Sequence, residues 1–362
     1  NNSHNKIIML GTGSAGVTRC YNTCFFLKTA DTSLLVDAGG GNGIMSQIEK
    51  AGINLTDIHH MFITHAHTDH ILGAVWVVRM IMHRLLGGEY KGNLNVYGND
   101  KVISTLKQIC LMTLHKNYNA LFGSRIMLCE KLSGDEFQAG DISMQCFDVL
   151  SDKEKQFGFR AIMPGGTTLV CMGDEPCNRA NYPIARGADW LMCEAFCLYK
   201  DRDVFKPYEK FHSTARDAGA VAAELGVKNL LLYHTEDKTL ATRRTEYTRE
   251  AVSQGLWLRP WPSSDPASAL VQDLIELEEE GGGGHGSGDD VTDGLGKEHA
   301  EHGVRDHMGQ DEDEGNEEDE LAQAGQQQAD LGLTQRHKAL LAGDLDTGGE
   351  DARHIDGMAQ VV

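Results

Sequence analysis

Short apolar runs recur throughout the first 255 residues, and their lengths and flanking turn residues predict an alternation of strands and helices. The runs at 6–10, 22–29 and 32–39 predict three successive strands near the start of the chain. The run IHHMFITH at 58–65 predicts a buried strand, and the longer run at 71–86 predicts a strongly apolar helix. Further strands are predicted at 93–98, 125–130, 141–150, 157–163, 167–174, 189–196 and 229–234, and further helices at 44–52 and 213–226.

Strands precede helices in both halves of this series. That order predicts two sheets with helices on their outer faces, which places the fold in the α/β class. Ser213 directly precedes the Ala-rich helix at 214–226 and is its predicted N-cap.

Charged residues divide the chain at about residue 255. Residues 1–255 carry 27 acidic and 27 basic side chains, whereas residues 256–362 carry 26 of the 53 acidic and only 6 of the 33 basic side chains. The second segment has few apolar residues, so it cannot bury enough surface to offset the entropy of folding. We predict one folded domain at 1–255 and a disordered acidic tail at 256–362. An acidic interaction arm and a shifted reading frame are the alternatives for the tail.

Composition also disfavours several classes of protein. No apolar run reaches the roughly 18 residues of a membrane span, and no charged-then-apolar signal segment is visible, so no membrane partner is predicted. The nine cysteines are irregularly spaced and form no CxxC motif, which favours reduced thiols in a cytoplasmic protein. The neutral first segment has no basic run and therefore no electrostatic footprint for nucleic acid.

The stretch GTGSAG at 11–16 matches the GxGxxG pattern of dinucleotide-binding turns. Such a site needs a helix to begin there, but VTRCYNTCFFL predicts a loop followed by a strand. We predict a tight turn, with a phosphate-binding loop as the alternative.

The stretch THAHTDH at 64–70 places four ligand-type side chains within six positions, directly after a predicted buried strand. Imidazole nitrogens and carboxylates are good ligands for zinc and similar divalent ions. His65 and His67 lie two residues apart and point the same way from a strand or its turn. Asp69 and His70 can reach a second ion from the start of the following helix. This density of ligands predicts a metal site in preference to a surface cluster of histidines.

Two further ligand candidates end predicted strands. Asp174 ends TTLVCMGD and His234 ends NLLLYH. Taken alone, they would fit a turn aspartate and a capping histidine. Their placement at strand ends, which they share with His65 and His67, favours a common metal site in which Asp174 could bridge two ions.

Together these motifs resemble the metallo-β-lactamase superfamily and, within it, the ribonuclease Z-like branch. The matching stretches run in the family's order and cover essentially all of residues 1–245. They are LGTGSA (10–15), LLVDAG (34–39), THAHTDH (64–70), MGDEP (172–176), CEAF (193–196), HSTARDAG (212–219) and LYHTED (232–237). The resemblance implies a four-layer αββα sandwich with a dinuclear metal site between the sheets. The ligands that it implies are His65 and His67 for the first ion, Asp69, His70 and His234 for the second, and Asp174 between them.

The chain departs from the family's pattern at two positions. The family has a third histidine on the first ion, a few residues before a Gly-Tyr/Phe-Arg element, but the segment before GFR at 158–160 contains no histidine. The branch's usual spacing leads to Asp152, which could be an oxygen ligand, and a small shift leads to Leu150, which cannot bind a metal. Cys193 stands where the branch usually has histidine, and we interpret it as a buried strand residue, with a thiolate ligand as the alternative.

The resemblance further implies a hydrolase that uses a metal-bound hydroxide. Two divalent ions, zinc or alternatively manganese, would activate the water and polarise a phosphoryl oxygen. Asp69 would orient the hydroxide or take its proton, and His212 would donate a proton to the leaving group, with Glu194 fixing the tautomer of His212. A purely structural hydrogen bond between Glu194 and His212 is the simpler alternative.

The predicted substrates are phosphodiesters. They are either RNA cleaved in 3′ processing or a small nucleotide, such as a cyclic nucleotide or a short oligonucleotide. The EA and HST elements disfavour β-lactam hydrolysis. A degenerate binding protein that holds one ion or none is the alternative from another class, and the missing third histidine motivates it. Dimers are common in the branch, so a homodimer is a further expectation.

Overall fold

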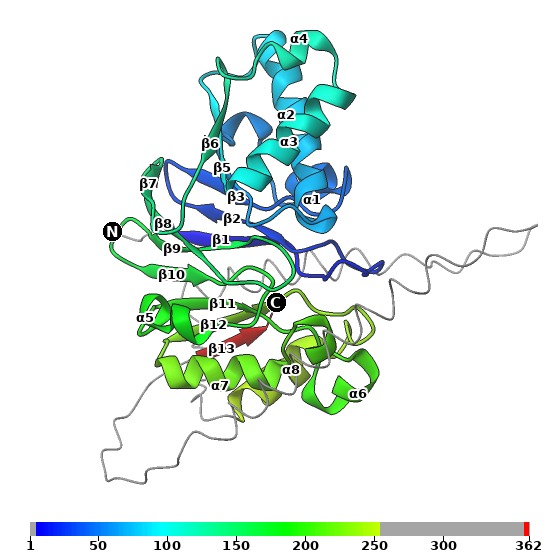
Figure 1. The fold of residues 1–362 in the computed structure, drawn as a ribbon, viewed down its shortest axis with the longest axis vertical. Helices are drawn as coiled ribbons and strands as arrows, with labels where there is room; N and C mark the ends of the chain where they lie inside the picture. Colours follow the sequence, from blue (N-terminus) through cyan, green and yellow to red (C-terminus); the bar gives the residue numbers. More distant parts are fainter. Residues whose placement is uncertain (1–4, 254–357, 362) are drawn as a thin grey trace, which may run out of the picture. The chain divides into compact units, whose positions relative to one another are not determined.

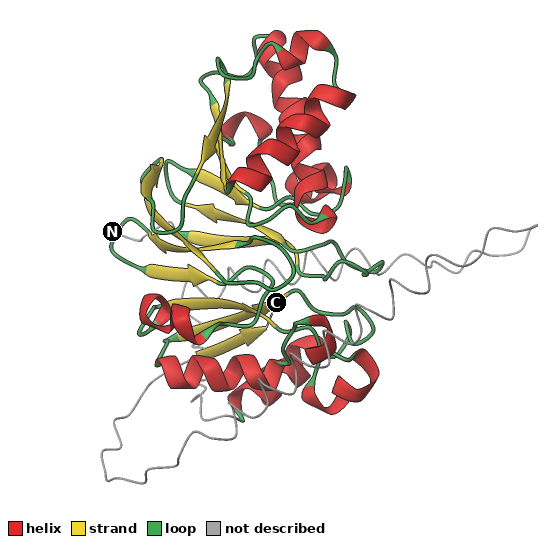
Figure 2. Ribbon diagram, viewed as in Figure 1, coloured by secondary structure: helices red, strands yellow, loops and turns green. Residues whose placement is uncertain are grey.

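Two β-sheets pack face to face, and helices cover the outer face of each sheet (Figure 1, Figure 2). This computed structural model describes residues 5–253 and 358–361, and all of them belong to one compact unit. Within these residues, none of the helices combines the length and the apolar character that crossing a bilayer requires.

The first sheet has the order β1-β2-β3-β4-β5-β6. Its first three strands are antiparallel, and β3 to β6 run parallel. The strands are β1 (Lys6–Gly11), β2 (Cys24–Lys28), β3 (Ser33–Val36), β4 (His60–Phe62), β5 (Leu94–Gly98) and β6 (Ile126–Glu130). The helices on its side are α1 (Gly43–Lys50), α2 (Thr68–Leu86), α3 (Asp100–Thr113) and α4 (Lys116–Asn119), with the 3-10 turn η1 (Leu55–Asp57).

The second sheet has the order β13-β12-β11-β10-β9-β8-β7, antiparallel from β7 to β10 and parallel from β10 to β13. The strands are β7 (Glu136–Ala139), β8 (Ile142–Asp148), β9 (Phe157–Ile162), β10 (Thr168–Cys171), β11 (Trp190–Glu194), β12 (Asn229–Tyr233) and β13 (Met358–Val361). Its helices are α5 (Tyr182–Ala185), α6 (Arg202–Phe205), α7 (Ala215–Leu225) and α8 (Arg243–Val252), with η2 (Arg179–Asn181), η3 (Tyr199–Asp201) and η4 (Tyr208–Lys210).

The alternation of side chains along β2 shows how one strand serves two cores. Cys24 and Phe26 pack among the helices of the first half, whereas Phe25 and Leu27 pack between the two sheets. A strand with apolar residues at every position is expected only where both faces of the sheet are covered. This arrangement confirms the predicted four-layer αββα sandwich.

The predicted strands and helices are confirmed, and within the described residues the sequence analysis missed β7, α3, α8 and the short helices α4, α5 and α6. Thr214, and not Ser213, is the N-cap of α7, because its side chain accepts from the amide of Asp217 in a capping box. At the other end of the chain, β13 pairs with β12 within the segment that we predicted to be a disordered tail. Residues 254–357 lie outside the described part, so the rest of that prediction and the domain boundary at 255 remain predictions.

One glycine sets how closely α2 approaches the first sheet. The Gly73 amide donates to the Gly39 carbonyl at 2.8 Å, and the Ala38 amide donates to the His70 carbonyl at 3.0 Å. A Cβ on Gly73 would lie 1.7 Å from the Ala38 carbonyl oxygen, which is far inside van der Waals contact. The start of α2 is therefore held against the loop after β3.

We expect Gly73→Ala to destabilise the fold by about 3 kcal/mol or more, because helix and loop must separate to admit the methyl group. Urea unfolding measures this change. Gly41→Ala is the matched control, since a Cβ there meets nothing within 4 Å. Equal stabilities of the two variants would contradict the close approach.

Candidate metal centre

The ends of parallel strands from both sheets meet at one edge of the sandwich. In the first sheet, Asp37 follows β3, and the histidine motif links β4 to α2. In the second sheet, Asp174, Glu194 and His234 stand at the carboxyl ends of β10, β11 and β12. Carboxyl ends of neighbouring parallel strands share an edge, so these polar side chains converge although they are far apart in the sequence.

One ligand set, called the second set here, consists of Asp69, His70 and His234. Asp69 Oδ2 lies 3.3 Å from His70 Nε2 and 3.5 Å from His234 Nε2. Ligands of a tetrahedral zinc ion at about 2.0–2.1 Å are roughly 3.3–3.4 Å apart, so these spacings fit one ion. The same three atoms are buried and have no hydrogen-bond partner. Buried polar atoms without hydrogen-bond partners are costly, and an ion bound among these three atoms would remove that cost.

The other set, called the first set here, consists of His65, His67 and Asp174. His65 Nε2 lies 2.9 Å from His67 Nδ1 and 3.6 Å from Asp174 Oδ2. Asp174 Oδ2 also lies 3.9 Å from His70 Nε2 and 3.6 Å from His234 Nε2. Asp174 therefore faces both sets and is placed to bridge two ions. A further convergent group, Glu194 with His212, shares His234 with the second set.

The protonation states of these residues suit metal binding. Burial lowers the pKa of His65 well below its usual range, although Asp174 opposes this effect, so its imidazole is neutral. Burial by itself would raise the pKa of Asp69, but His70 and His234 outweigh it and hold that pKa below its ordinary value. Burial likewise opposes ionisation of Asp174, yet the neighbouring histidines lower its pKa well below the usual range. Two ionised carboxylates thus lie beside the neutral imidazole of His65.

Asp37 supports both sets from behind, a role that the sequence analysis missed. Its Oδ2 accepts hydrogen bonds from His70 Nδ1 and Thr64 Oγ1, both at 2.8 Å. Thr64 Oγ1 lies 2.9 Å from His65 Nδ1 and can accept a hydrogen bond from it, which leaves His65 Nε2 to bind a metal. Burial would lower the pKa of His70, but Asp37 and Asp69 raise it well above its usual value. A divalent ion at His70 Nε2 would therefore replace a proton.

His212 and Glu194 form a pair beside the ligand sets. His212 Nδ1 lies 3.5 Å from Glu194 Oε2, and neither atom has a hydrogen-bond partner. The ring of Phe196 stacks on the His212 ring with centroids 4.9 Å apart and planes 8° apart. The Ser213 amide donates to Glu194 Oε1 and holds the carboxylate in place. The pair can keep a proton on Nδ1 while Nε2 faces the cavity.

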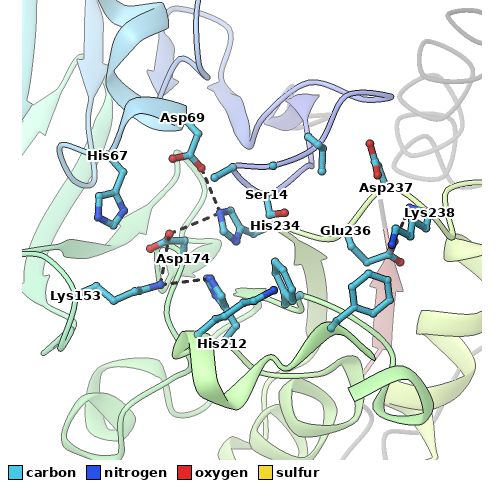
Figure 3. Close-up of a pocket in the computed structure, with 16 residues that line it drawn as sticks. Ser14, His67, Asp69, Lys153, Asp174, His212, His234, Glu236, Asp237 and Lys238 are labelled. Carbon is cyan, nitrogen blue, oxygen red and sulfur yellow. Dashed lines mark hydrogen bonds and ion pairs between the residues drawn. The ribbon is translucent and has the colours of Figure 1, made fainter. Parts of the chain in front are cut away.

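A cavity of about 440 Å³ opens over these groups. Figure 3 shows a continuous series of contacts at its base, from Asp69 through His234 and Asp174 to Lys153 and His212. Residues 14–17, from the GTGSAG stretch and its neighbour, also line it. No helix begins at this stretch, and its Gly13 and Ser14 amides donate to backbone carbonyls, so the predicted tight turn is confirmed.

The structure brings together every predicted site residue except Asp152. That side chain is exposed, and it is in none of the three convergent groups of the described residues. The next residue, Lys153, lines the cavity in its place. Cys193 is buried in the core against α7, and burial raises the pKa of its thiol well above the usual value, which argues against a thiolate ligand. A signal for Asp37 did exist, because a carboxylate directly follows the apolar strand in LLVDAG, as Asp174 follows TTLVCMG.

Comparisons with known proteins agree with this geometry. Residues 5–257 match the family model of the Anti-Pycsar protein Apyc1. The ribonuclease Z of Thermobifida fusca (strain YX) is 26% identical over 292 aligned positions, which cover 69% of this chain and 90% of that protein. The ribonuclease Z of Methanothermobacter thermautotrophicus is 28% identical over 323 positions, covering 75% of this chain and 96% of that protein.

Solved structures establish the fold. The metallo-β-lactamase fold protein YhfI from Bacillus subtilis aligns with a TM-score of 0.56 and 19% identity, covering 69% of this chain and 92% of its own. Zn²⁺-bound PqqB from Methylobacterium extorquens aligns with a TM-score of 0.53 and 14% identity over 70% of this chain and 96% of its own. The short form of human tRNase Z aligns with a TM-score of 0.51 and 20% identity over 65% of this chain and 93% of its own.

The buried, convergent ligand atoms and these relatives point to the same class of protein. The chain is a metal-dependent hydrolase of the metallo-β-lactamase superfamily, in its ribonuclease Z-like branch, and it belongs to the Anti-Pycsar protein Apyc1 family.

Proposed function

We propose that the protein is a metal-dependent phosphodiesterase that acts on a small nucleotide, such as a cyclic nucleotide or a short oligonucleotide. The observation that carries the proposal is the pair of ligand sets sharing Asp174 at the base of a cavity of about 440 Å³. Sites of roughly 300–1,000 Å³ suit small-molecule ligands.

In this proposal His65 and His67 would hold the first ion and Asp69, His70 and His234 the second, and Asp174, which faces both sets, would contribute to both. Zinc is the first candidate because of its preference for imidazole and carboxylate in compact sites, and manganese is the alternative. Divalent ions bound there would supply a nucleophile at neutral pH and offset the negative charge of a phosphodiester.

The remaining chemistry belongs to residues of the chain. Asp69 lines the cavity, and its ionised carboxylate can accept a hydrogen bond from a water molecule and orient it. His212 lies across the cavity base with Nε2 facing inward, where it can give a proton to the departing oxygen. Glu194, fully buried behind His212, would hold the other ring nitrogen in its protonated form.

RNA is the second candidate substrate, because curated relatives are named ribonuclease Z. Two features favour the smaller substrate. Residues 1–255 carry no net charge, so they offer little attraction for an extended phosphate backbone. The stretch from 99 to 125, where an RNA-gripping insertion could lie, forms α3 and α4 packed beside α2.

We expect the zinc- or manganese-loaded protein to hydrolyse a 3′,5′-cyclic nucleotide or a dinucleotide, and His67→Ala to lower kcat/KM by roughly 10²- to 10³-fold. The loss follows from removing one ligand of the first set with little change in the core. His83→Ala is the control, since His83 is exposed and lies outside the cavity. Unchanged turnover in His67→Ala would contradict the proposal. Cleavage of a 3′-extended tRNA with no turnover of small diesters would favour the RNA candidate.

Asp37→Asn should weaken metal binding by roughly 10- to 100-fold, because both carboxylate oxygens accept hydrogen bonds, Oδ1 from the Thr64 amide and Oδ2 from Thr64 Oγ1 and His70 Nδ1, and an NH₂ group at either place cannot accept. Titration against a competing chelator measures the affinity. Asp203→Asn is the control, because that side chain is 86% exposed. Parent-like affinity in Asp37→Asn would remove Asp37 from the support of the ligands.

The role of His212 predicts a dependence on the leaving group. His212→Ala should lower the rate by roughly 10²- to 10⁴-fold for a diester that releases a sugar hydroxyl, which needs a proton to depart. The loss should be far smaller for bis(p-nitrophenyl) phosphate, because nitrophenolate departs without one. Equal losses for both substrates would mean that His212 acts by binding or structure and not as an acid.

A further inference from the structure

A lysine enters the cavity from the loop before GFR, the loop in which the family pattern has a histidine. Lys153 lies in the loop between β8 and β9, and its side chain is 18% exposed. Its Nζ lies 3.1 Å from Glu175 Oε1, 3.5 Å from His212 Nε2 and 3.9 Å from Asp174 Oδ2. The ammonium group therefore sits between a shared metal-binding carboxylate and the proposed proton donor (Figure 3).

The ammonium group is only partly satisfied by the protein. An ammonium carries three hydrogens to donate, and a good N–H···O bond spans about 2.7–3.2 Å. Only the contact to Glu175 falls in this range, while the contacts to His212 and Asp174 are longer. Lys153 thus keeps donor capacity on the side that faces the cavity.

The position of Lys153 also determines which part of a bound ligand its ammonium group can contact. A phosphate group that reached both the shared carboxylate and His212 would lie beside the ammonium, because the two are 3.9 Å and 3.5 Å from Nζ. The surroundings are acidic, since Asp69, Asp174 and Glu194 all face this region. A fixed cation among these carboxylates offsets the repulsion that an incoming anion would otherwise meet.

We propose that Lys153 is a substrate-binding residue that donates a hydrogen bond to a non-bridging phosphate oxygen. This inference rests on the proposed function, because it assigns the residue that receives the phosphate of that substrate. Lys153 thereby supplies positive charge from the loop in which the family pattern has its third histidine. Glu175 orients the lysine, and its own carboxylate is anchored by the Ser151 hydroxyl, which donates to Oε1 at 2.7 Å.

The test uses inorganic phosphate as the probe, and the metal-loaded full-length protein. Lys153→Met removes the charged nitrogen and keeps an unbranched side chain of the remaining length, and Lys153→Arg keeps the charge. Lys155→Met is the matched control, because it removes a lysine two residues away whose Nζ pairs with exposed Asp100 at 2.5 Å. The double variant Lys153→Met/Glu175→Gln avoids leaving a buried carboxylate without its partner.

We expect the phosphate Kd to rise roughly 10- to 100-fold in Lys153→Met and in the double variant, with kcat/KM for the small diester falling by at least as much. Lys153→Arg should stay within about 10-fold of the parent, and Lys155→Met should equal it. Metal content, measured by elemental analysis, should not fall in any of the four variants.

Three results would overturn the inference. Parent-like phosphate affinity in Lys153→Met would show that the ammonium does not contact phosphate. Recovered affinity in the double variant, or lost metal in Lys153→Met, would show that Lys153 acts on the shape of the site. The proposed function fails separately. If phosphate binding depends on Lys153 but the parent protein cleaves no phosphodiester, only the proposed function is contradicted. If the parent cleaves diesters and Lys153→Met cleaves them equally well, only the inference about Lys153 is contradicted.

Discussion

The rest of this structure depends on compensating the negative charge of two buried carboxylates, Asp69 and Asp174. Their side chains are 8% and 4% exposed, and an ionised carboxylate in such surroundings is costly unless positive charge lies beside it. Protons on the neighbouring histidines can provide that charge, and so can divalent ions. The buried nitrogens of His70 and His234 that lack hydrogen-bond partners favour the ions, because only a cation in the middle would satisfy all of these atoms together.

The sandwich fold places histidines and carboxylates around this site by bringing strand ends of two sheets together. A single sheet could deliver only one row of carboxyl ends, but here Asp37 and the histidine motif come from one sheet and Asp174 and His234 from the other. The apolar side chains of Phe62 and Phe159, whose rings meet edge to face at 5.2 Å, hold the two sheets together. Packing between the sheets is therefore also what keeps the two ligand sets in register.

The sequence predicted the parts of the site that depend on short-range pattern. Apolar strands end at His65, Asp174 and His234, and strand ends are recognisable from periodicity and composition. The prediction of Asp152 as a third ligand depends on spacing alone, and spacing is a weak guide there because the segment 149–156 is an irregular loop without periodicity. A one-residue difference in such a loop decides whether Asp152 or Lys153 enters the cavity, and only the tertiary structure resolves it. Asp37 was missed for a different reason: its role depends on contacts across β3, β4 and α2.

The missing third histidine supports a degenerate binding protein less than the sequence alone suggested. A site that had lost its chemistry would be free to fill its cavity with apolar side chains or to pair its polar atoms internally. Here the first set still presents three ligand atoms within 4.8 Å of one another, and the second set keeps unpartnered atoms on Asp69, His70 and His234. Retaining such costly groups is reasonable only where a cation offsets the cost. Lys153, which enters the cavity from the loop that lacks the histidine, is therefore consistent with a site that binds an anionic ligand and not with the decay of the site.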